Sequence, residues 1–263
     1  MVVTTMLYDA DTSRRVEATY TTPDVIEQRR QVLGTLALQP GERVLDIGSG
    51  PGFLAVEMAA AVGPAGEVQG VDVSGSMLVL AEAREVSAGS APVTFRRGGA
   101  EQLPVPNASF DVAVSTQVLE YVEDVPGALA EIHRVLRPGG RVLLLDTDWD
   151  SIVWHSEDDE RMARVLVAWE EHLVDPHLPR TLGASLEAAG FDVAAPWVLP
   201  LLNTGYAPDT YSVGLLDIVA AFVSGRAGVS AEDVDAWAED LRTLGTGYFF
   251  SLNRYVFCAT KPA

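Results

Sequence analysis

The sequence predicts an α/β fold in which a doubly wound, mostly parallel sheet carries helices on both faces. Short apolar runs alternate with longer stretches of helical periodicity, which is typical of this class. Some runs, such as 142–145, are apolar at every position, as in strands buried on both faces. A glycine-rich turn follows the first run, where sheets of this class bind ligands.

The strands and helices of the first half follow each other regularly. We expect a helix at 23–38, with Pro23 in its first turn and Pro40-Gly41 after its end. The strands expected after it are 43–47, 67–71, 93–96, 110–115 and 141–145, and the helices between them are 53–62, 76–87 and 125–136.

The second half contains further helices and two strands. We expect helices at 159–173 and 179–189, strands at 191–195 and 249–259, and two helices within 209–244. Ser230 with Asp233 resembles a capping box at the start of the last helix. The apolar residues of 213–223 either pack on the core or form a dimer contact.

Composition indicates one folded unit. Hydrophobic residues make up 48% and charged residues 21% of the 263 residues, enough for a substantial core. We treat 1–263 as a single domain, with a lid at 1–40, a ligand-binding core at 41–150, substrate-side helices and a cap at 151–245 and a last strand at 246–263.

The charge and the cysteine content limit which partners, compartment and metal sites we expect. The 18 basic and 37 acidic residues give a net charge of -19, which repels phosphate backbones and anionic lipid, so we expect neither nucleic acid nor membrane as a partner. No apolar signal core precedes Arg15, and we expect a cytoplasmic protein. Cys258 is the single cysteine, which excludes an internal disulfide and a cysteine metal cluster, and we expect no metal.

The glycine-rich turn is Asp46-x-Gly48-x-Gly50-x-Gly52. Glycines let the backbone turn tightly and let a ligand approach it. Asp72 ends the second strand about twenty residues further on, where an acid binds ribose hydroxyls; the alternative is that it only caps the helix from Ser74.

These two signals also fit a nicotinamide dehydrogenase. However, the glycine spacing is not the Gly-x-Gly-x-x-Gly of the dinucleotide fingerprint. Asp46 would repel a pyrophosphate, whereas it suits a ligand with an ammonium group. The pattern therefore argues against a dinucleotide and favours a ligand that carries an ammonium group.

Four motifs in this order resemble those of class I S-adenosylmethionine-dependent methyltransferases, in the group of ubiquinone/menaquinone-type and small-molecule enzymes. They are Val44–Gly52, Gly70–Met77, Gly98–Pro104 with Ser109–Asp111, and Leu136–Arg141. The resemblance implies a Rossmann-like sheet of seven strands with an antiparallel last strand. It also implies a helical N-terminal lid and a helical cap between the last two strands.

The resemblance implies S-adenosylmethionine as the cofactor. Gly99 stands where the family often has Asp, so backbone groups near Ala100 and Glu101 would hold the adenine. Arg29 would reach the methionine carboxylate, unless it belongs to a solvated helix face. The expected cofactor-binding residues are Tyr20, Arg29, Asp46, Gly48, Ser49, Gly50, Gly52, Asp72, Val73, Met77, Gly99, Ala100, Glu101, Gln117 and Val118.

The acceptor side is expected after the fourth and fifth strands and in the cap. Aromatic residues at the carboxyl edge suggest an apolar or planar acceptor. We expect His155 as a general base and Tyr20 as a second catalytic residue; His133 is structural, and the roles of His172 and His177 stay open. The expected acceptor-binding residues are Tyr121, Trp149, Trp154, Asn203 and Tyr206, although Tyr121 equally suits a helix start.

The sequence therefore predicts methyl transfer by in-line displacement to a small-molecule acceptor, by a monomer or homodimer. Two alternatives stay open. The first is an enzyme of this fold that binds S-adenosylmethionine but catalyses a non-methylating reaction, and the second is a regulatory module that binds the cofactor.

Overall fold

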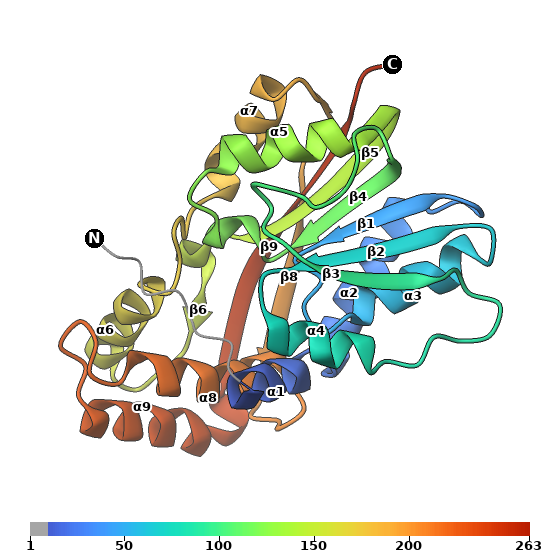
Figure 1. Ribbon diagram of the computed structural model, residues 1–263. Helices are drawn as coiled ribbons and strands as arrows, with labels where there is room; N and C mark the ends of the chain where they lie inside the picture. The colour runs from blue at the N-terminus through green and yellow to red at the C-terminus, as the bar shows by residue number, and fades with distance from the viewer. Residues whose placement is uncertain (1–9) are drawn as a thin grey trace.

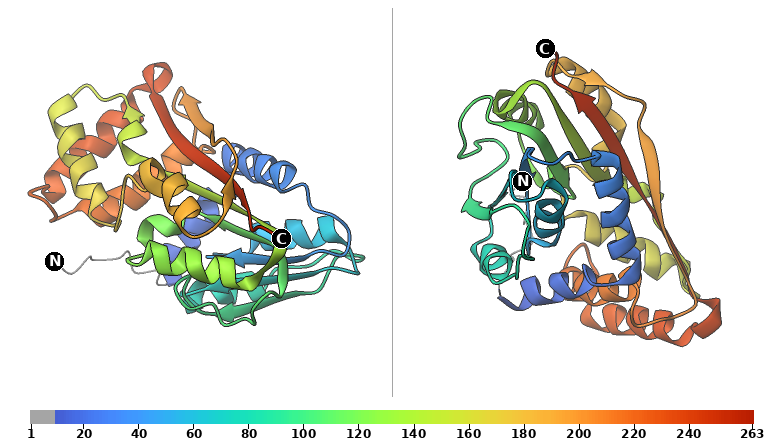
Figure 2. Two further views of the ribbon diagram at one scale, coloured as in Figure 1. Left: turned by 90° about the horizontal axis from the view of Figure 1, so that it is seen from above. Right: turned by 90° about the vertical axis from the view of Figure 1, so that its right-hand side faces the viewer.

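The computed structural model describes residues 10–263, which form a layered α/β structure (Figures 1 and 2). The strands follow the order β3-β2-β1-β4-β5-β9-β6, and the order reverses between β1 and β4. Five neighbouring strands are parallel. They are β1 (Arg43–Ile47), β2 (Glu67–Asp72), β3 (Val93–Arg97), β4 (Phe110–Thr116) and β5 (Leu136–Thr147).

The predicted fold class is confirmed, but the sheet is larger than predicted. It has nine strands among the described residues, because the two-residue strands β6 (Val153–Trp154) and β7 (Asp192–Val193) also pair with β9 (Phe249–Thr260). The last strand, β9, runs antiparallel to β5, as predicted.

The strand before β9 lies later in the chain than predicted. Only β7 forms within 191–195, whereas the long strand is β8 (Trp197–Thr204). The prediction assigned residues from 200 onward to the cap because the chain between the last two strands is longer than the fold requires. A proline inside a strand is found mainly at a sheet edge. Pro200 fits here since β8 pairs with β9 alone and so lies at an edge.

Helices cover both faces of the sheet (Figure 2). On one face, α2 (Pro23–Leu36) and α3 (Phe53–Val62) pack with Val44 and Val112 of the sheet. On the other, α5 (Val125–Val135) and α7 (Pro179–Ala188) pack with Leu45 and Leu144. The fully buried Leu129 and Ile132 of α5 each contribute about 1.5–3 kcal/mol through burial. The helix α4 (Gly75–Glu82) ends five residues earlier than predicted.

A group of helices lies at the carboxyl edge of the sheet, at the lower left of Figure 1. It consists of α6 (Asp159–Glu170), α8 (Tyr211–Val223) and α9 (Ala231–Thr243). Leu215 and Val219 of α8 are buried within this group, which favours core packing over a dimer contact. The predicted capping box of Ser230 and Asp233 is confirmed at the start of α9.

The helix α1 (Ala10–Thr19) lies in the predicted helical lid, before the one helix whose bounds the sequence predicted there. It packs on α8 and α4. Residues 1–9 of the predicted lid lie outside the described residues. The division into lid, core, cap and last strand stays a prediction.

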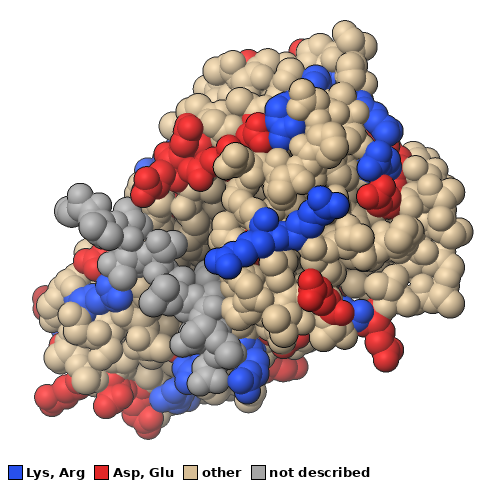
Figure 3. Space-filling view, in the orientation of Figure 1, with Lys and Arg blue, Asp and Glu red and all other residues tan. Residues whose placement is uncertain are grey.

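Two surface properties complete the description. In Figure 3, basic side chains form a short row across the middle of the visible face, with acidic side chains in separate groups around it. On this face, the acidic excess is therefore not one continuous patch. Within residues 10–263, no helix combines the length and apolar composition needed to cross a bilayer.

Candidate active site

A cavity of about 800 Å³, here called the large cavity, lies at the carboxyl ends of β1, β2 and β4. Its position is where strand order reverses in the sheet, as expected for a ligand site in this class. Val16 of α1 and the adjoining Tyr20 form part of its wall. Ligand pockets usually measure about 300–1,000 Å³.

The glycine turn forms one wall of the large cavity. Gly48, Gly50 and Gly52 have φ angles of 69°, 51° and 80°, in the left-handed region that favours glycine. A Cβ at position 48 would lie 2.2 Å from Val118 Cγ2, so two segments meet closely there. A Cβ at Gly52 would instead meet Ala81 and Phe95, and Gly52 does not line the cavity.

Asp72 faces the turn from the end of β2. Its Oδ2 accepts a hydrogen bond from the Gly50 N–H at 2.8 Å, and its Oδ1 accepts one from the Ser74 N–H at 2.8 Å. Burial raises the pKa of Asp72, and these hydrogen bonds offset part of the rise. Ser74, not Asp72, caps α4 by accepting from the Met77 N–H, so capping does not explain Asp72.

Asp46 is buried, with 2% of its surface exposed, and its Oδ2 has no hydrogen-bond partner among the described residues. Burial and the nearby Asp72 charge raise the pKa of Asp46 to about 7. Asp46 and Ser49 line a side cavity of about 30 Å³ next to the turn. A buried carboxylate oxygen without a partner fits a ligand that brings its own donor.

Arg29 also lines the side cavity, but its guanidinium already has partners. Its Nε donates to Glu57 Oε1 at 3.0 Å and its Nη1 to the Tyr20 carbonyl at 2.5 Å. Arg29 is 8% exposed, so it is not part of a solvated helix face. It holds Tyr20 beside the large cavity.

The structure brings most of the predicted cofactor residues together. Besides the turn, Asp72 and Tyr20, the wall of the large cavity includes Val73, Met77, Gly99, Ala100, Glu101, Gln117, Val118 and Tyr121. They come from the segment after β2 and the start of α4, from the loop after β3 and from the segment after β4.

A second space, here called the small cavity, measures about 90 Å³, room for several water molecules. It shares Tyr20, Gln117 and Tyr121 with the large cavity. Trp149 and Trp169 form aromatic walls of the small cavity. A ligand in one cavity would therefore lie next to a ligand in the other.

Glu120 is a charged wall residue of the small cavity that sequence reasoning missed. Its Oε2 accepts a hydrogen bond from Trp149 Nε1 at 3.1 Å. Burial raises the pKa of Glu120 to about 7, although the Trp149 hydrogen bond and the Arg254 charge lower it in part. Asp146 of β5 accepts from the Glu120 N–H at 3.4 Å, and burial and the Glu120 charge raise its pKa well above the usual value.

Arg254 of β9 is the second charged wall residue that the sequence did not reveal. It is 4% exposed, and its Nη1 donates to Gln28 Oε1. Its guanidinium lies 4.7 Å from the ring centre of Tyr211, and its Nε has no partner among the described residues. No Arg254 nitrogen lies within 4.0 Å of a Glu120 carboxylate oxygen, so the two charges do not form an ion pair.

Of the predicted acceptor residues, the structure places Trp149 and Tyr121 in the small cavity, but not the others. Trp154 donates from Nε1 to Tyr248 Oη and packs in the cap core, and Tyr206 packs edge-on against Tyr248. Asn203 bonds to Asp24 and to the Ser212 N–H. His155, the predicted base, is exposed and lines neither cavity.

The other histidines have structural surroundings. His172 is buried and stacks on Trp169, with 3.7 Å between ring centres, and burial lowers the pKa of His172 to about 3. His133 packs edge-on against Phe191.

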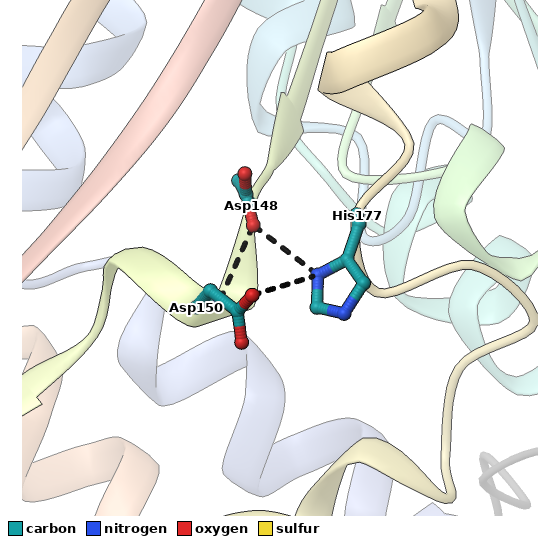
Figure 4. A group of neighbouring side chains, drawn as sticks. All are labelled: Asp148, Asp150 and His177. Atoms are coloured by element: carbon teal, nitrogen blue, oxygen red, sulfur yellow. Dashed lines mark hydrogen bonds and ion pairs between the residues drawn. The ribbon is translucent and has the colours of Figure 1, made fainter.

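His177 belongs to a possible metal-ligand group with Asp148 and Asp150 (Figure 4). Arg180 already binds both carboxylates, through Nε to Asp148 at 2.7 Å and through Nη2 to Asp150 at 2.5 Å. Because a guanidinium neutralises the carboxylates, we assign no metal to this group.

The fold and the large cavity together are those of a nucleotide-binding protein of the doubly wound α/β class. The small cavity adjoins the large one. Residues 45–144 match a family model described as a methyltransferase domain. This match, together with the similar proteins described below, supports the class I S-adenosylmethionine-dependent methyltransferase superfamily that the motifs predict. It also supports S-adenosylmethionine as the cofactor and does not support a nicotinamide dehydrogenase.

Three similar proteins illustrate this relationship. An uncharacterized 37.1 kDa protein in transposon Tn4556 of Streptomyces fradiae is 36% identical, over 65% of this chain and 49% of that protein. Demethylmenaquinone methyltransferase of Geobacillus kaustophilus is 38% identical, over 46% of this chain and 52% of that enzyme. The chain thus spans about half the length of the curated relatives it matches. The crystal structure of YcgJ from Bacillus subtilis superimposes with a TM-score of 0.60 at 25% identity, covering 90% of this chain and 99% of that one.

Proposed function

We propose that this protein transfers the methyl group of S-adenosylmethionine to a small hydroxylated ring compound. One observation carries the proposal: the large cavity, bordered by the glycine turn and Asp72, adjoins an aromatic-walled small cavity through Tyr20, Gln117 and Tyr121. Methyl transfer needs the donor and the acceptor side by side and in line, and two adjoining cavities can hold them in that way.

The residues of the large cavity and of the side cavity next to it fit the cofactor chemically. Asp72 of the large cavity offers carboxylate oxygens to ribose hydroxyls, and Asp46 of the side cavity offers an unpartnered buried oxygen to the ammonium group. Val73, Met77 and Ala100 offer apolar surface to the adenine. The cofactor supplies an activated methyl group, so the protein's task is to bind, orient and exclude water.

The acceptor proposal is supported by the shape and chemistry of the small cavity. Trp149, Trp169 and Tyr121 suit a planar ring, and the relatives named above include an enzyme that methylates demethylmenaquinone. We further propose that the protein acts in the cytoplasm, as a monomer or homodimer, on neither nucleic acid nor membrane, in keeping with its net charge of -19.

The test is to incubate the purified protein with methyl-labelled S-adenosylmethionine and a panel of reduced 1,4-naphthoquinone, other phenols and amines. We expect label in a phenolic product, and loss of labelling in Asp46→Asn but not in the exposed control Asp192→Asn. Cofactor binding with no labelled product in any reaction would support a non-methylating enzyme or a regulatory module instead. Binding of NAD in place of S-adenosylmethionine would contradict the proposal at its base.

A further inference from the structure

The small cavity holds two opposite charges that do not touch each other. Glu120 and Arg254 both line it, both are at least 96% buried, and no nitrogen of Arg254 lies within 4.0 Å of a Glu120 carboxylate oxygen. Buried charges of opposite sign usually pair directly, because desolvation is costly without a partner. Both charges therefore lie in the wall of one cavity without neutralising each other directly.

Each charge is fixed by neighbours that leave part of it available. Trp149 Nε1 holds one carboxylate oxygen of Glu120. Gln28 and the ring of Tyr211 hold the Arg254 guanidinium, while its buried Nε has no partner among the described residues. A buried guanidinium donor that lacks a protein partner favours a ligand with an anionic oxygen.

We propose that Glu120 accepts the proton of the acceptor's ring hydroxyl and that Arg254 binds the oxyanion that remains. This inference rests on the proposed function and adds to it the residues that activate the acceptor. Neither residue stands in a recognisable sequence motif: Glu120 follows β4, and Arg254 lies within β9.

The hydroxyl proton moves to Glu120, and the electrons of the oxyanion form a bond from the oxygen, or from the adjacent ring carbon, to the methyl carbon. The methyl–sulfur bond breaks, its electron pair stays on sulfur, and S-adenosylhomocysteine leaves. If carbon is the nucleophile, the ring proton it loses returns to the oxygen. Glu120 then releases its proton to water.

The surroundings of Glu120 suit this role. The titratable and charged groups near it are Asp146, which accepts from its N–H, Arg254, and the phenols of Tyr20, Tyr121 and Tyr211 in the wall of the same cavity. Burial raises the pKa of Tyr20 to about 12 and also raises that of Tyr211, so both phenols stay neutral near pH 7. The pKa of Glu120, about 7, matches a base that works near neutral pH.

The kinetic test uses reduced 1,4-naphthoquinone as acceptor. Glu120→Gln keeps the shape of the side chain, and we expect kcat to fall about 100-fold or more, with the acid limb of the pH profile lost and the Kd of S-adenosylmethionine unchanged. The matched control Glu171→Gln changes an exposed glutamate and should behave as wild type. A kcat within threefold of wild type, or an unchanged pH profile, would overturn the role of Glu120.

A binding test does not depend on turnover. Wild-type protein saturated with S-adenosylhomocysteine is titrated with 4-nitrophenol, whose anion is coloured. We expect Arg254→Met to weaken binding of the anion at least tenfold, Arg254→Lys to restore part of it, and the exposed control Arg96→Met to have no effect. Above pH 7, binding to wild type should take up a proton, and binding to Glu120→Gln should not.

The two tests separate the possible failures. Failure to bind S-adenosylhomocysteine, or failure of every acceptor to become labelled, contradicts the proposed function. If nitrophenol fails to bind the wild type, or binds wild type and Arg254→Met equally, the assignment of Arg254 is wrong even if methyl transfer occurs.

Discussion

The N–H of Gly50 donates a 2.8 Å hydrogen bond to Oδ2 of Asp72, which fastens the glycine turn after β1 to the end of β2. Asp72 also accepts from the Ser74 N–H, so one carboxylate orders two segments that border the large cavity. The side chain therefore shapes the cofactor site in addition to any contact with the ligand.

Asp72→Ala should weaken binding of S-adenosylhomocysteine by about 1–3 kcal/mol, the range for hydrogen bonds lost in a buried site. Isothermal titration calorimetry measures the change, with Asp192→Ala as an exposed control. Unchanged affinity would remove Asp72 from the binding site.

Gly48→Ala should abolish tight cofactor binding and lower stability more than Gly139→Ala. Both glycines have similar φ angles, 69° and 77°, so the backbone strain is matched at about 1–2 kcal/mol. Only at Gly48 would the new Cβ collide, 2.2 Å from Val118 Cγ2, while Gly139 has open space. Equal losses of unfolding free energy in urea titrations would show that the close contact at Gly48 is unimportant.

Cofactor affinity should fall as the pH drops through about 7. Asp46 has a pKa of about 7 in the free protein, because of burial and the Asp72 charge, and must be ionised to bind an ammonium group. The limiting slope for one proton is about tenfold in Kd per pH unit. Calorimetry across this range should show the slope in wild type and a flatter dependence, with weaker binding, in Asp46→Asn. A wild-type Kd that stays constant below pH 7 would contradict the assignment.

The ligand-free protein should lose stability as the pH rises through about 7. Burial raises the pKa values of Asp46 and Glu120 to about 7 and that of Asp146 well above its usual value. Groups with raised native pKa values stabilise the fold most below their unfolded values of about 4 and lose that contribution as they ionise.

The contribution of Asp148 to stability depends on pH in the opposite direction, and it does so in a more acidic range. Burial alone would raise its pKa, but hydrogen bonds from Arg180 and His177 outweigh it and lower the pKa. The stability that Asp148 contributes is therefore lost only below about pH 4.

The loss of stability near pH 7 is measured by thermal unfolding between about pH 5 and 8. We expect a falling Tm in wild type and a shallower fall in Asp46→Asn. A wild-type Tm that rises over this range would refute the prediction.

The sequence was most informative where local chemistry and structure coincide. The spacing of Gly48, Gly50 and Gly52 after an apolar strand requires a tight turn, and parallel strands bring Asp72 to the same edge. These constraints hold over short stretches of chain, so they can be read without coordinates.

The two charged residues of the small cavity escaped prediction because they come from distant segments. Arg254 occupies one of the alternating buried positions of β9 and shows no motif in the sequence, and Glu120 resembles the start of a helix. His155 was attractive because it follows β5, yet the chain turns through β6 and leaves it exposed. Only tertiary packing brings Glu120 and Arg254 together.

The strand β9 pairs with β5, β6, β7 and β8, and all four precede it in the chain. During synthesis these strands emerge first and must wait for their common partner. Until Phe249–Thr260 leaves the ribosome, β8 lacks its one pairing partner and Arg254 is missing from the small cavity. The glycine turn and Asp72 are available much earlier, so a nascent chain would acquire its donor-binding half before the half that receives the methyl group.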